Sequence, residues 1–107
     1  MNSMDNKQAA SLIEKWIPYY EMDEPEAWER DEYPSVKNAC KSMRLAIQVL
    51  RGKPAAGDAQ LKEAAKQLEQ FLEEHYLDDP DEWEKENVAF VQQVLEAIQY
   101  TIVFLKK

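Results

Sequence analysis

The sequence is poor in the residues that thiol and metal chemistry require. Its 107 residues include one cysteine, Cys40, and one histidine, His75. A lone cysteine cannot form an internal disulfide, and a zinc site needs several nitrogen or sulfur ligands. Cys40 also shares a helical apolar face with Val36, Met43 and Ile47, so we expect a buried core thiol. No catalytic residue and no metal ligand is predicted.

Glycine is equally scarce, with two residues in the chain. The sequence therefore contains neither a phosphate-binding glycine loop nor a dinucleotide-binding fingerprint. The acidic run around Asp78 and Asp79 lacks the glycine and the ligand spacing of an EF-hand, and Pro80 favours the start of a helix. No Glu-x-x-His pair of a carboxylate-bridged metal site is present. We expect no enzyme and no cofactor, and a carboxylate-based metal-binding protein is the least favoured alternative.

Basic residues are outnumbered, since 13 Lys and Arg face 21 Asp and Glu and the net charge is -8. This balance argues against direct binding of nucleic acid or anionic lipid, which reward clustered basic residues. The N-terminus does not resemble a secretory leader, and no apolar stretch is expected to approach the length of a membrane span. The sequence thus predicts a cytoplasmic protein without membrane contact and leaves a basic protein partner open.

The chain does have enough apolar residues to close a core. Hydrophobic residues make up 45% and charged residues 32% of the sequence, a balance typical of globular domains. The length matches one domain. We therefore expect residues 1–107 to form a single domain.

An internal repeat organises this domain. When the sequence is shifted by 55 residues, both halves align without a gap. Identical residues meet at Lys7/Lys62, Ala9/Ala64, Ala10/Ala65, Glu14/Glu69, Asp23/Asp78, Pro25/Pro80, Trp28/Trp83, Glu29/Glu84, Val36/Val91, Ile47/Ile102 and Leu50/Leu105. The alignment predicts a tandem duplication, with repeat one at residues 3–52, a linker at 52–58 and repeat two at 58–107.

Helical periodicity fills both repeats. In repeat two, an apolar face predicts a helix over about 59–75 with Asp58 as its cap; it consists of Leu61, Ala64, Ala65, Leu68, Phe71 and Leu72. Asp79 and Pro80 then read as the cap and first residue of a helix that runs to near the C-terminus. Repeat one follows the same plan, with Ser3 or Asp5 as cap, Pro25 opening its second helix, and a kink or restart at Pro34. The predicted fold is an all-α four-helix up-down bundle made of two tandem helix hairpins.

An up-down bundle brings both intra-repeat turns to one end. We call residues 21–32 the first tip, residues 73–86 the second tip, and both together the acidic end. Fifteen carboxylates lie there: Glu21, Asp23, Glu24, Glu26, Glu29, Asp31, Glu32, Glu73, Glu74, Asp78, Asp79, Asp81, Glu82, Glu84 and Glu86. The opposite end is expected to collect Arg44, Arg51, Lys53, Lys62, Lys106 and Lys107.

Aromatic residues accompany these carboxylates, and such residues often anchor protein interfaces. The predicted partner-binding residues are Tyr20, Asp23, Glu24, Trp28, Tyr76, Asp78, Asp79 and Trp83. They favour a small non-catalytic module that binds a basic protein, as an inhibitor, immunity protein or antitoxin would. In the alternative interpretation, the tryptophans plug the end of the bundle and the carboxylates stabilise helix starts or keep the protein soluble.

The last helix has a second apolar stripe, which contains Phe90, Tyr100 and Phe104. A surface helix needs only one such stripe. Either this helix lies at the centre of the bundle and touches both remaining helices, or the stripe forms the seam of a homodimer. The homodimer is the alternative function.

Overall fold

The computed structural model describes residues 4–53 and 57–107. Within these ranges all regular secondary structure is helical, and the prediction of an all-α four-helix bundle is confirmed. The four α-helices are α1 (Asn6–Tyr19), α2 (Tyr33–Leu50), α3 (Asp58–His75) and α4 (Val88–Lys106), and three short 3-10 helices are η1 (Pro25–Ala27), η2 (Pro80–Glu82) and η3 (Lys85–Asn87). Ser3 and part of the predicted linker lie outside the described residues.

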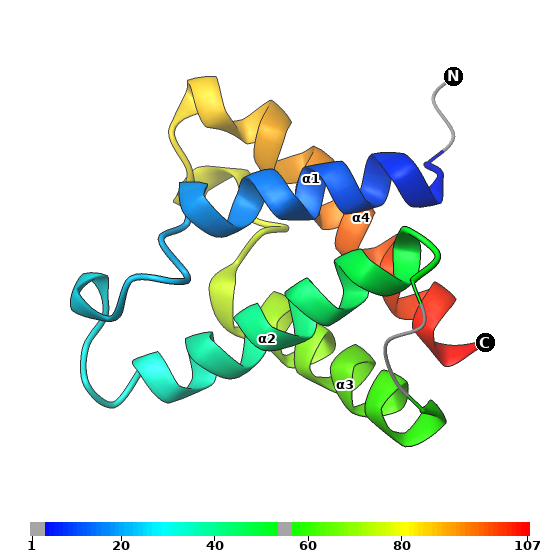
Figure 1. Cartoon of the computed structure of the whole chain (residues 1–107). Coiled ribbons are helices and arrows are strands. Elements are labelled where there is room, and N and C mark those ends of the chain that lie inside the picture. Colours follow the sequence, from blue (N-terminus) through cyan, green and yellow to red (C-terminus); the bar gives the residue numbers. More distant parts are fainter. Residues whose placement is uncertain (1–3, 54–56) are drawn as a thin grey trace.

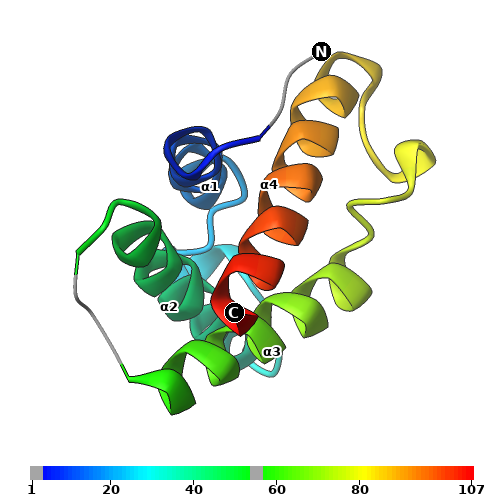
Figure 2. The same cartoon turned by 90° about the vertical axis from the view of Figure 1, so that its right-hand side faces the viewer.

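The helices form two layers, each made of one antiparallel hairpin (Figures 1 and 2). Helices α1 and α2 form one layer, and α3 and α4 form the other. Helix α1 packs on α4, and α2 packs on α3. Helices α2 and α4 therefore each contact both α1 and α3. The two tips lie at the same end of the bundle, away from the last turn of α4 (Figure 1). The predicted common end is therefore present.

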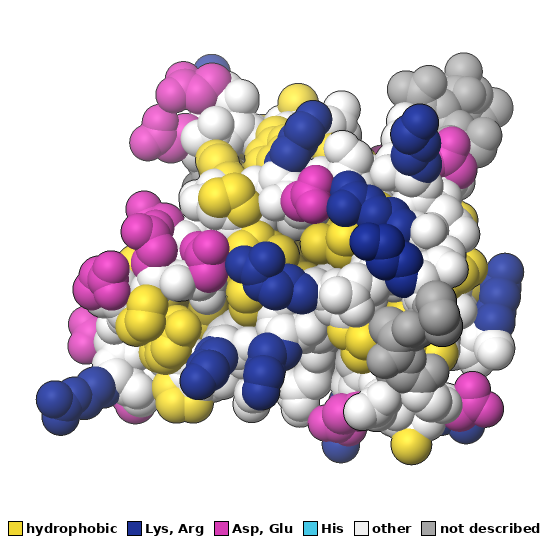
Figure 3. Space-filling model, viewed as in Figure 1, with side chains coloured by type: hydrophobic (Ala, Val, Ile, Leu, Met, Phe, Trp, Pro, Cys, Tyr) yellow, Lys and Arg dark blue, Asp and Glu magenta, His cyan; other side chains and the backbone are white. Residues whose placement is uncertain are grey.

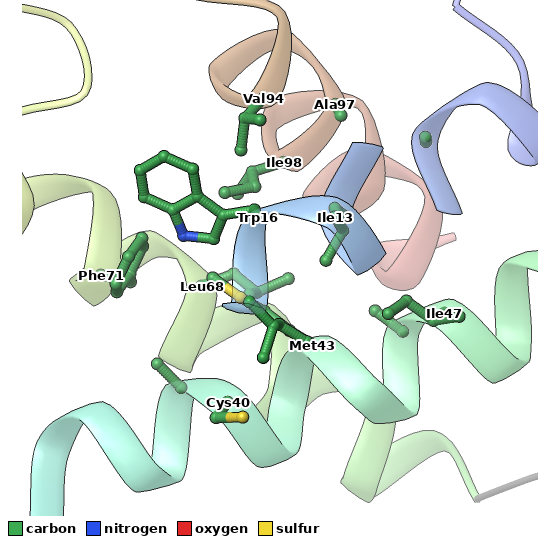
Figure 4. Packing of buried hydrophobic residues seen from close by; sticks show 14 of the residues in the cluster. Ile13, Trp16, Cys40, Met43, Ile47, Leu68, Phe71, Val94, Ala97 and Ile98 are labelled. Carbon is green, nitrogen blue, oxygen red and sulfur yellow. The ribbon is translucent and has the colours of Figure 1, made fainter. Parts of the chain in front are cut away.

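The core lies between the two layers. Each helix contributes a face of buried residues; on α1 they are Ala9, Ala10, Ile13, Trp16 and Ile17. Figure 4 shows Ile13 and Trp16 in the same cluster as Met43 of α2, Leu68 of α3 and Ile98 of α4. Cys40 is buried in this cluster, as predicted. The period-3.6 apolar pattern was therefore sufficient to identify the faces that meet.

One sequence expectation about membranes is corrected. Residues 85–106 form a helical stretch that is long and apolar enough to cross a membrane, judged by length and composition alone. The central helix of a bundle meets the same criterion, because it is apolar on more than one face. Helix α4 packs against both α1 and α3, and Val94, Ala97 and Ile98 are fully buried.

The helix starts also differ in part from prediction. Asp5 caps α1, since the Gln8 N–H donates to its carboxylate oxygen Oδ1 at 2.7 Å. Asp58 is the first residue of α3 and not its cap. The cap is Gly57, whose N–H donates to the Gln60 side chain at 3.3 Å. Gly57 has the extended backbone that is typical of an N-cap residue.

Neither Pro25 nor Pro80 opens a long helix. Each opens a 3-10 turn of three residues, and Asp79 caps the second of these turns through the Asp81 N–H at 3.1 Å. Helix α2 begins only at Tyr33 and α4 only at Val88. Pro34 consequently lies in the first turn of α2, where a missing N–H costs nothing. The predicted restart at Pro34 is confirmed, and no kink is needed.

The tryptophans explain why the helices start late. After each 3-10 turn, Trp28 and Trp83 adopt an extended backbone, which turns the indole back toward the preceding α-helix. The Trp28 indole N–H donates to the carbonyl of Glu21 at 2.8 Å, and the Trp83 indole N–H donates to the carbonyl of Tyr76 at 2.9 Å. Each tip is thus closed by an indole clamp, by which we mean this indole-to-carbonyl hydrogen bond.

The clamps follow the 55-residue register. Glu21 and Tyr76, which accept the two bonds, both have a positive φ, at 53° and 57°. The two halves therefore share local conformation at the aligned positions. A tandem duplication as the origin of this match stays a prediction.

We expect Trp28→Phe and Trp83→Phe each to lower the free energy of unfolding by about 1–2 kcal/mol, because a tip carbonyl loses its indole partner. Urea unfolding followed by far-UV circular dichroism measures the change. Tyr19→Phe is the control: no hydrogen bond of its hydroxyl is found in the described chain, so a change within about 0.5 kcal/mol is expected. Equal stabilities for all three variants would show that water replaces the clamp.

Candidate functional site

The acidic end is held together by an aromatic cluster centred on Trp16, which is 0% exposed. The Trp16 indole stacks on Tyr20 with ring centroids 4.7 Å apart. It also meets Trp83 at 5.7 Å and Phe71 at 6.3 Å, both edge to face. Trp28 joins through Tyr20, at 5.3 Å. Tyr20, the residue after α1, therefore contacts a ring of each tip, Trp28 at 5.3 Å and Trp83 at 5.7 Å, and its stacking on Trp16 links both tips to the core.

The nitrogen of Trp16 is buried without a hydrogen-bond partner among the described residues. Figure 4 shows it on the side of the indole where Phe71 lies. The two rings are nearly perpendicular, at 81°. An aromatic face is a weak acceptor for an N–H group, which reduces the cost of leaving this donor unpaired. The position of Trp16 is thus set by ring packing and not by a hydrogen bond.

Tyr20 and His75, which are aligned positions of the two repeats, contact each other directly. The Tyr20 hydroxyl and His75 Nδ1 are 3.0 Å apart, and both side chains are half-buried. Burial lowers the pKa of His75, and the negative charges of Glu74 and Glu32, which raise it, only partly offset this effect. Burial, assisted by the charge of Glu32, raises the pKa of Tyr20 to about 12. Both directions agree with a neutral imidazole whose Nδ1 accepts a hydrogen bond from the Tyr20 hydroxyl. The sequence predicted packing or hydrogen bonding for His75, but not this partner.

The predicted partner-binding residues lie at this end, but several have structural roles. Trp28 and Trp83 are half-buried and use their N–H groups in the indole clamps. Asp79 caps η2. Asp23 lies 3.5 Å from Arg44. Glu24 and Asp78 are exposed, and their side chains make no hydrogen bond or ion pair in the described chain. Tyr76 is exposed too, but its backbone carbonyl accepts the Trp83 clamp.

The carboxylates of the acidic end face solvent. All fifteen are exposed except Asp79, which is half-buried. Within the described ranges, only Asp23 forms an ion pair. Glu74 accepts a hydrogen bond from Ser35 of α2 at 3.3 Å, which ties the two layers together at this end. Figure 3 shows acidic side chains along the edge formed by the tips. The result is a negative surface with few compensating cations.

The expected collection of basic residues at the opposite end is wrong for Arg44. Its contact with Asp23 places it beside the first tip. Because α2 begins only at Tyr33, Arg44 lies closer to the start of the helix than an opening at Pro25 would place it. Arg51 pairs with Glu14 of α1 through two contacts of 3.0 Å, and Lys106 pairs with Glu69 at 2.9 Å. A continuous row of basic residues along α2 was missed. Its signal was the absence of any Asp or Glu from residues 33–57.

The second stripe of α4 is largely in contact with α1. Phe90 meets Tyr19 at 5.1 Å and Trp16 at 6.3 Å. The Tyr100 hydroxyl donates to Asn6, and the Tyr100 ring stacks with Phe104 at 6.5 Å. All three seam residues are half-buried. The packing against α1 accounts for much of the stripe without a second subunit.

The chemistry of the acidic end is that of a charged surface. Among the described residues, no group of three His, Cys, Asp or Glu side chains is placed to hold a metal ion. A small cavity of about 80 Å³ lies beneath the second tip, between Leu77, Trp83 and Leu95. No family model matches the sequence, and no curated protein or solved structure is detectably similar to the chain.

We expect stability to fall as the pH drops from about 7.5 to about 5.5, because His75 must stay neutral in the fold. Its folded pKa lies below its unfolded value, so the unfolded chain binds more protons in this window and stability rises with pH. Urea unfolding at several pH values measures the slope, which should be shallower in His75→Gln. An NMR titration of the wild-type imidazole should give a pKa below 6.5. A value above 6.5 would contradict the assignment.

Proposed function

We propose that this chain is a non-catalytic binding module whose acidic end engages a basic surface of another protein. The observation that supports this proposal is the joining of two separate acidic tips into one rigid surface by the cluster around Trp16. Fourteen of its fifteen carboxylates have no ion pair in the described chain, since Asp23 alone is paired. Such a surface is suited to a partner that supplies the missing cations.

Crowded carboxylates lower the stability of a compact protein through mutual repulsion. Dipole stabilisation does not account for Glu73 and Glu74, which lie in the last turns of α3, where a negative charge is unfavourable. A basic partner would relieve the repulsion on binding. The same field would steer the partner toward the tips and raise its association rate. The repulsion within the free protein therefore becomes part of the driving force for binding.

The exposed rings add an apolar component to this surface. Tyr76, at the C-terminal end of α3, is 56% exposed, and Tyr19 at the end of α1 is 39% exposed. Tyrosine combines a large apolar body with a hydroxyl and is enriched at interface hot spots. We infer that Tyr76 is the aromatic contact and that Trp83 holds its backbone in place through the indole clamp. An inhibitor, immunity protein or antitoxin would use such an end to cover a basic site.

The test reverses charge at carboxylates that have no bond to the rest of the chain. Glu26→Lys with Glu82→Lys changes one exposed residue in each tip and leaves Asp23, Asp79 and both indole clamps intact. Wild type and variant serve as bait in lysate of the cell that makes the protein, and mass spectrometry compares the retained proteins. We expect a basic protein to be retained by wild type and lost by at least tenfold in the variant, because each reversed charge now repels it.

Glu63→Lys with Glu96→Lys is the matched control, with the same change in net charge on exposed helix positions away from the tips. It should retain the partner nearly as well as wild type. Circular dichroism checks that both variants remain helical. If the control loses the partner equally, net charge decides binding and the acidic end has no special role. If no protein distinguishes wild type from the tip variant, the proposal fails.

A second candidate function is a homodimer whose seam includes the outer face of α4. Val103 favours it, because this large apolar side chain is 59% exposed beside Phe104. An apolar seam persists at high salt, whereas charge-driven contacts weaken. A dimer mass at high salt that falls to the monomer mass in Val103→Arg would support the seam. A monomer mass of 12.5 kDa for wild type at high salt would exclude it.

A further inference from the structure

The outer side of α2 is a continuous basic face in an acidic protein. Residues 33–57 contain no Asp or Glu but carry five of the chain's 13 basic residues, a local charge of +5 against -8 for the whole chain. We define the basic face of α2 by these five residues: Lys37, Lys41, Arg44, Arg51 and Lys53. All five are exposed. The remainder of the chain therefore carries -13.

The spacing of these residues places them in one row. Lys37, Lys41, Arg44 and Arg51 follow one another at intervals of four, three and seven, which are the intervals of one helix face. At about 1.5 Å per residue, the row from Lys37 to Arg51 is about 21 Å long. Figure 3 shows basic side chains in this row across the face that α1 and α2 present.

The row is only partly neutralised within the chain. Arg44 contacts Asp23, and Arg51 contacts Glu14 across a groove of about 450 Å³ between α1 and α2. Lys37 and Lys41 form no ion pair in the described ranges. The half of the row nearest the start of α2 is therefore free to receive carboxylates from outside.

We propose that the basic face of α2 binds the second tip of another copy of this chain. The second tip carries eight carboxylates, and none of them is ion-paired in the part of the chain that the structure describes. The first tip is a poorer match, because Asp23 already contacts Arg44 of its own chain. The second tip belongs to the layer of α3 and α4, whereas the basic face belongs to α2 in the other layer (Figure 2). Within one chain, Glu74 of the second tip reaches Ser35 of α2, but no carboxylate of the second tip pairs with a residue of the basic face in the described ranges. A second chain can supply that pairing.

The contact is head to tail, because it joins two different surfaces. Contacts of this kind generate rings or open chains and not a closed twofold dimer. The net charge of -8 makes two copies repel at long range, but at physiological ionic strength the repulsion is screened beyond about 8 Å. Opposite charges in contact then dominate. Association should be weak, reversible and strongly dependent on salt.

Self-association of this kind would cover the second tip and thereby reduce the surface open to another basic partner. The inference shares the acidic end with the proposed function but does not rest on it, because the α2 basic face could bind a second copy whether or not a foreign partner exists. The regulatory consequence is that a basic partner of higher affinity would compete with self-association and release single chains.

Sedimentation velocity over a range of protein concentrations at physiological ionic strength tests the proposal. We expect the weight-average mass of wild type to rise above 12.5 kDa with concentration and to return to that value at high salt. Lys37→Gln with Lys41→Gln should weaken association about tenfold, the effect of losing two exposed charge pairs. Glu82→Gln with Glu86→Gln should weaken it similarly.

Lys62→Gln with Lys66→Gln provides a matched control. These lysines are the fifth and ninth residues of α3, as Lys37 and Lys41 are of α2, and all four are exposed. The control should associate like wild type. Neutral glutamine is a good helix former and adds no new charge. If only the α2 variant loses association, the loss is therefore due to the basic face and not to a change in the fold.

Mixing the two weakened variants gives the sharpest test. The Glu82→Gln/Glu86→Gln variant keeps the basic face, and the Lys37→Gln/Lys41→Gln variant keeps the second tip. The mixture can form one intact contact, so we expect pairs of one chain of each kind and no longer chains. Fluorescent labelling of one variant detects these pairs in the same sedimentation run.

Three results would overturn the proposal: a wild-type mass that stays at 12.5 kDa at every concentration at physiological ionic strength, equal weakening by the α3 control, or no pairing in the mixture. A dimer that persists in high salt and in both Gln variants would point to the α4 seam. These outcomes are independent of lysate capture, so the self-association and the proposed function fail separately.

Discussion

The buried indole of Trp16 is the contact on which the arrangement of the whole acidic end depends. It lies on α1 but touches Tyr20 beside the first tip, Phe71 on α3 and Trp83 in the second tip. The two tips come from different layers, and the backbone connects them only through the full length of the bundle. Aromatic packing therefore determines how the two sets of carboxylates face solvent. Without this cluster, the tips would be separate acidic loops.

The clamped tips also explain how the protein tolerates its own charge. Carboxylates repel one another, and a flexible loop would respond by moving apart. In each tip, an indole N–H holds the carbonyl of a residue with a left-handed backbone, so the turn keeps its shape despite the repulsion. Pro25 and Pro80, which follow in the two tips, further restrict the backbone because the proline ring fixes φ. The acidic surface is thus kept rigid by apolar and uncharged contacts lying beneath it, and a partner that binds there meets a preformed site.

The sequence predicted the features that depend on local periodicity and missed those that depend on contacts between distant residues. Leu68 and Phe71 mark a helix face because a period of 3.6 places them together, and both are buried. The late start of α2 was missed because Trp28 leaves helical geometry for a hydrogen bond to Glu21, which local propensity does not reveal. The position of Arg44 depended on that start. The pairing of Tyr20 with His75 needed the packing of two repeats, which an alignment of the repeats does not give.

Two pairs of aligned positions contact each other, Trp16 with Phe71 and Tyr20 with His75. In each pair the two residues lie 55 positions apart and belong to different hairpins. Each of these four residues therefore packs against a residue of the other hairpin. A change at one of them alters the packing of both hairpins at once, and neither hairpin can open while leaving the other with its own core. We therefore expect the two hairpins to unfold together, as one cooperative unit.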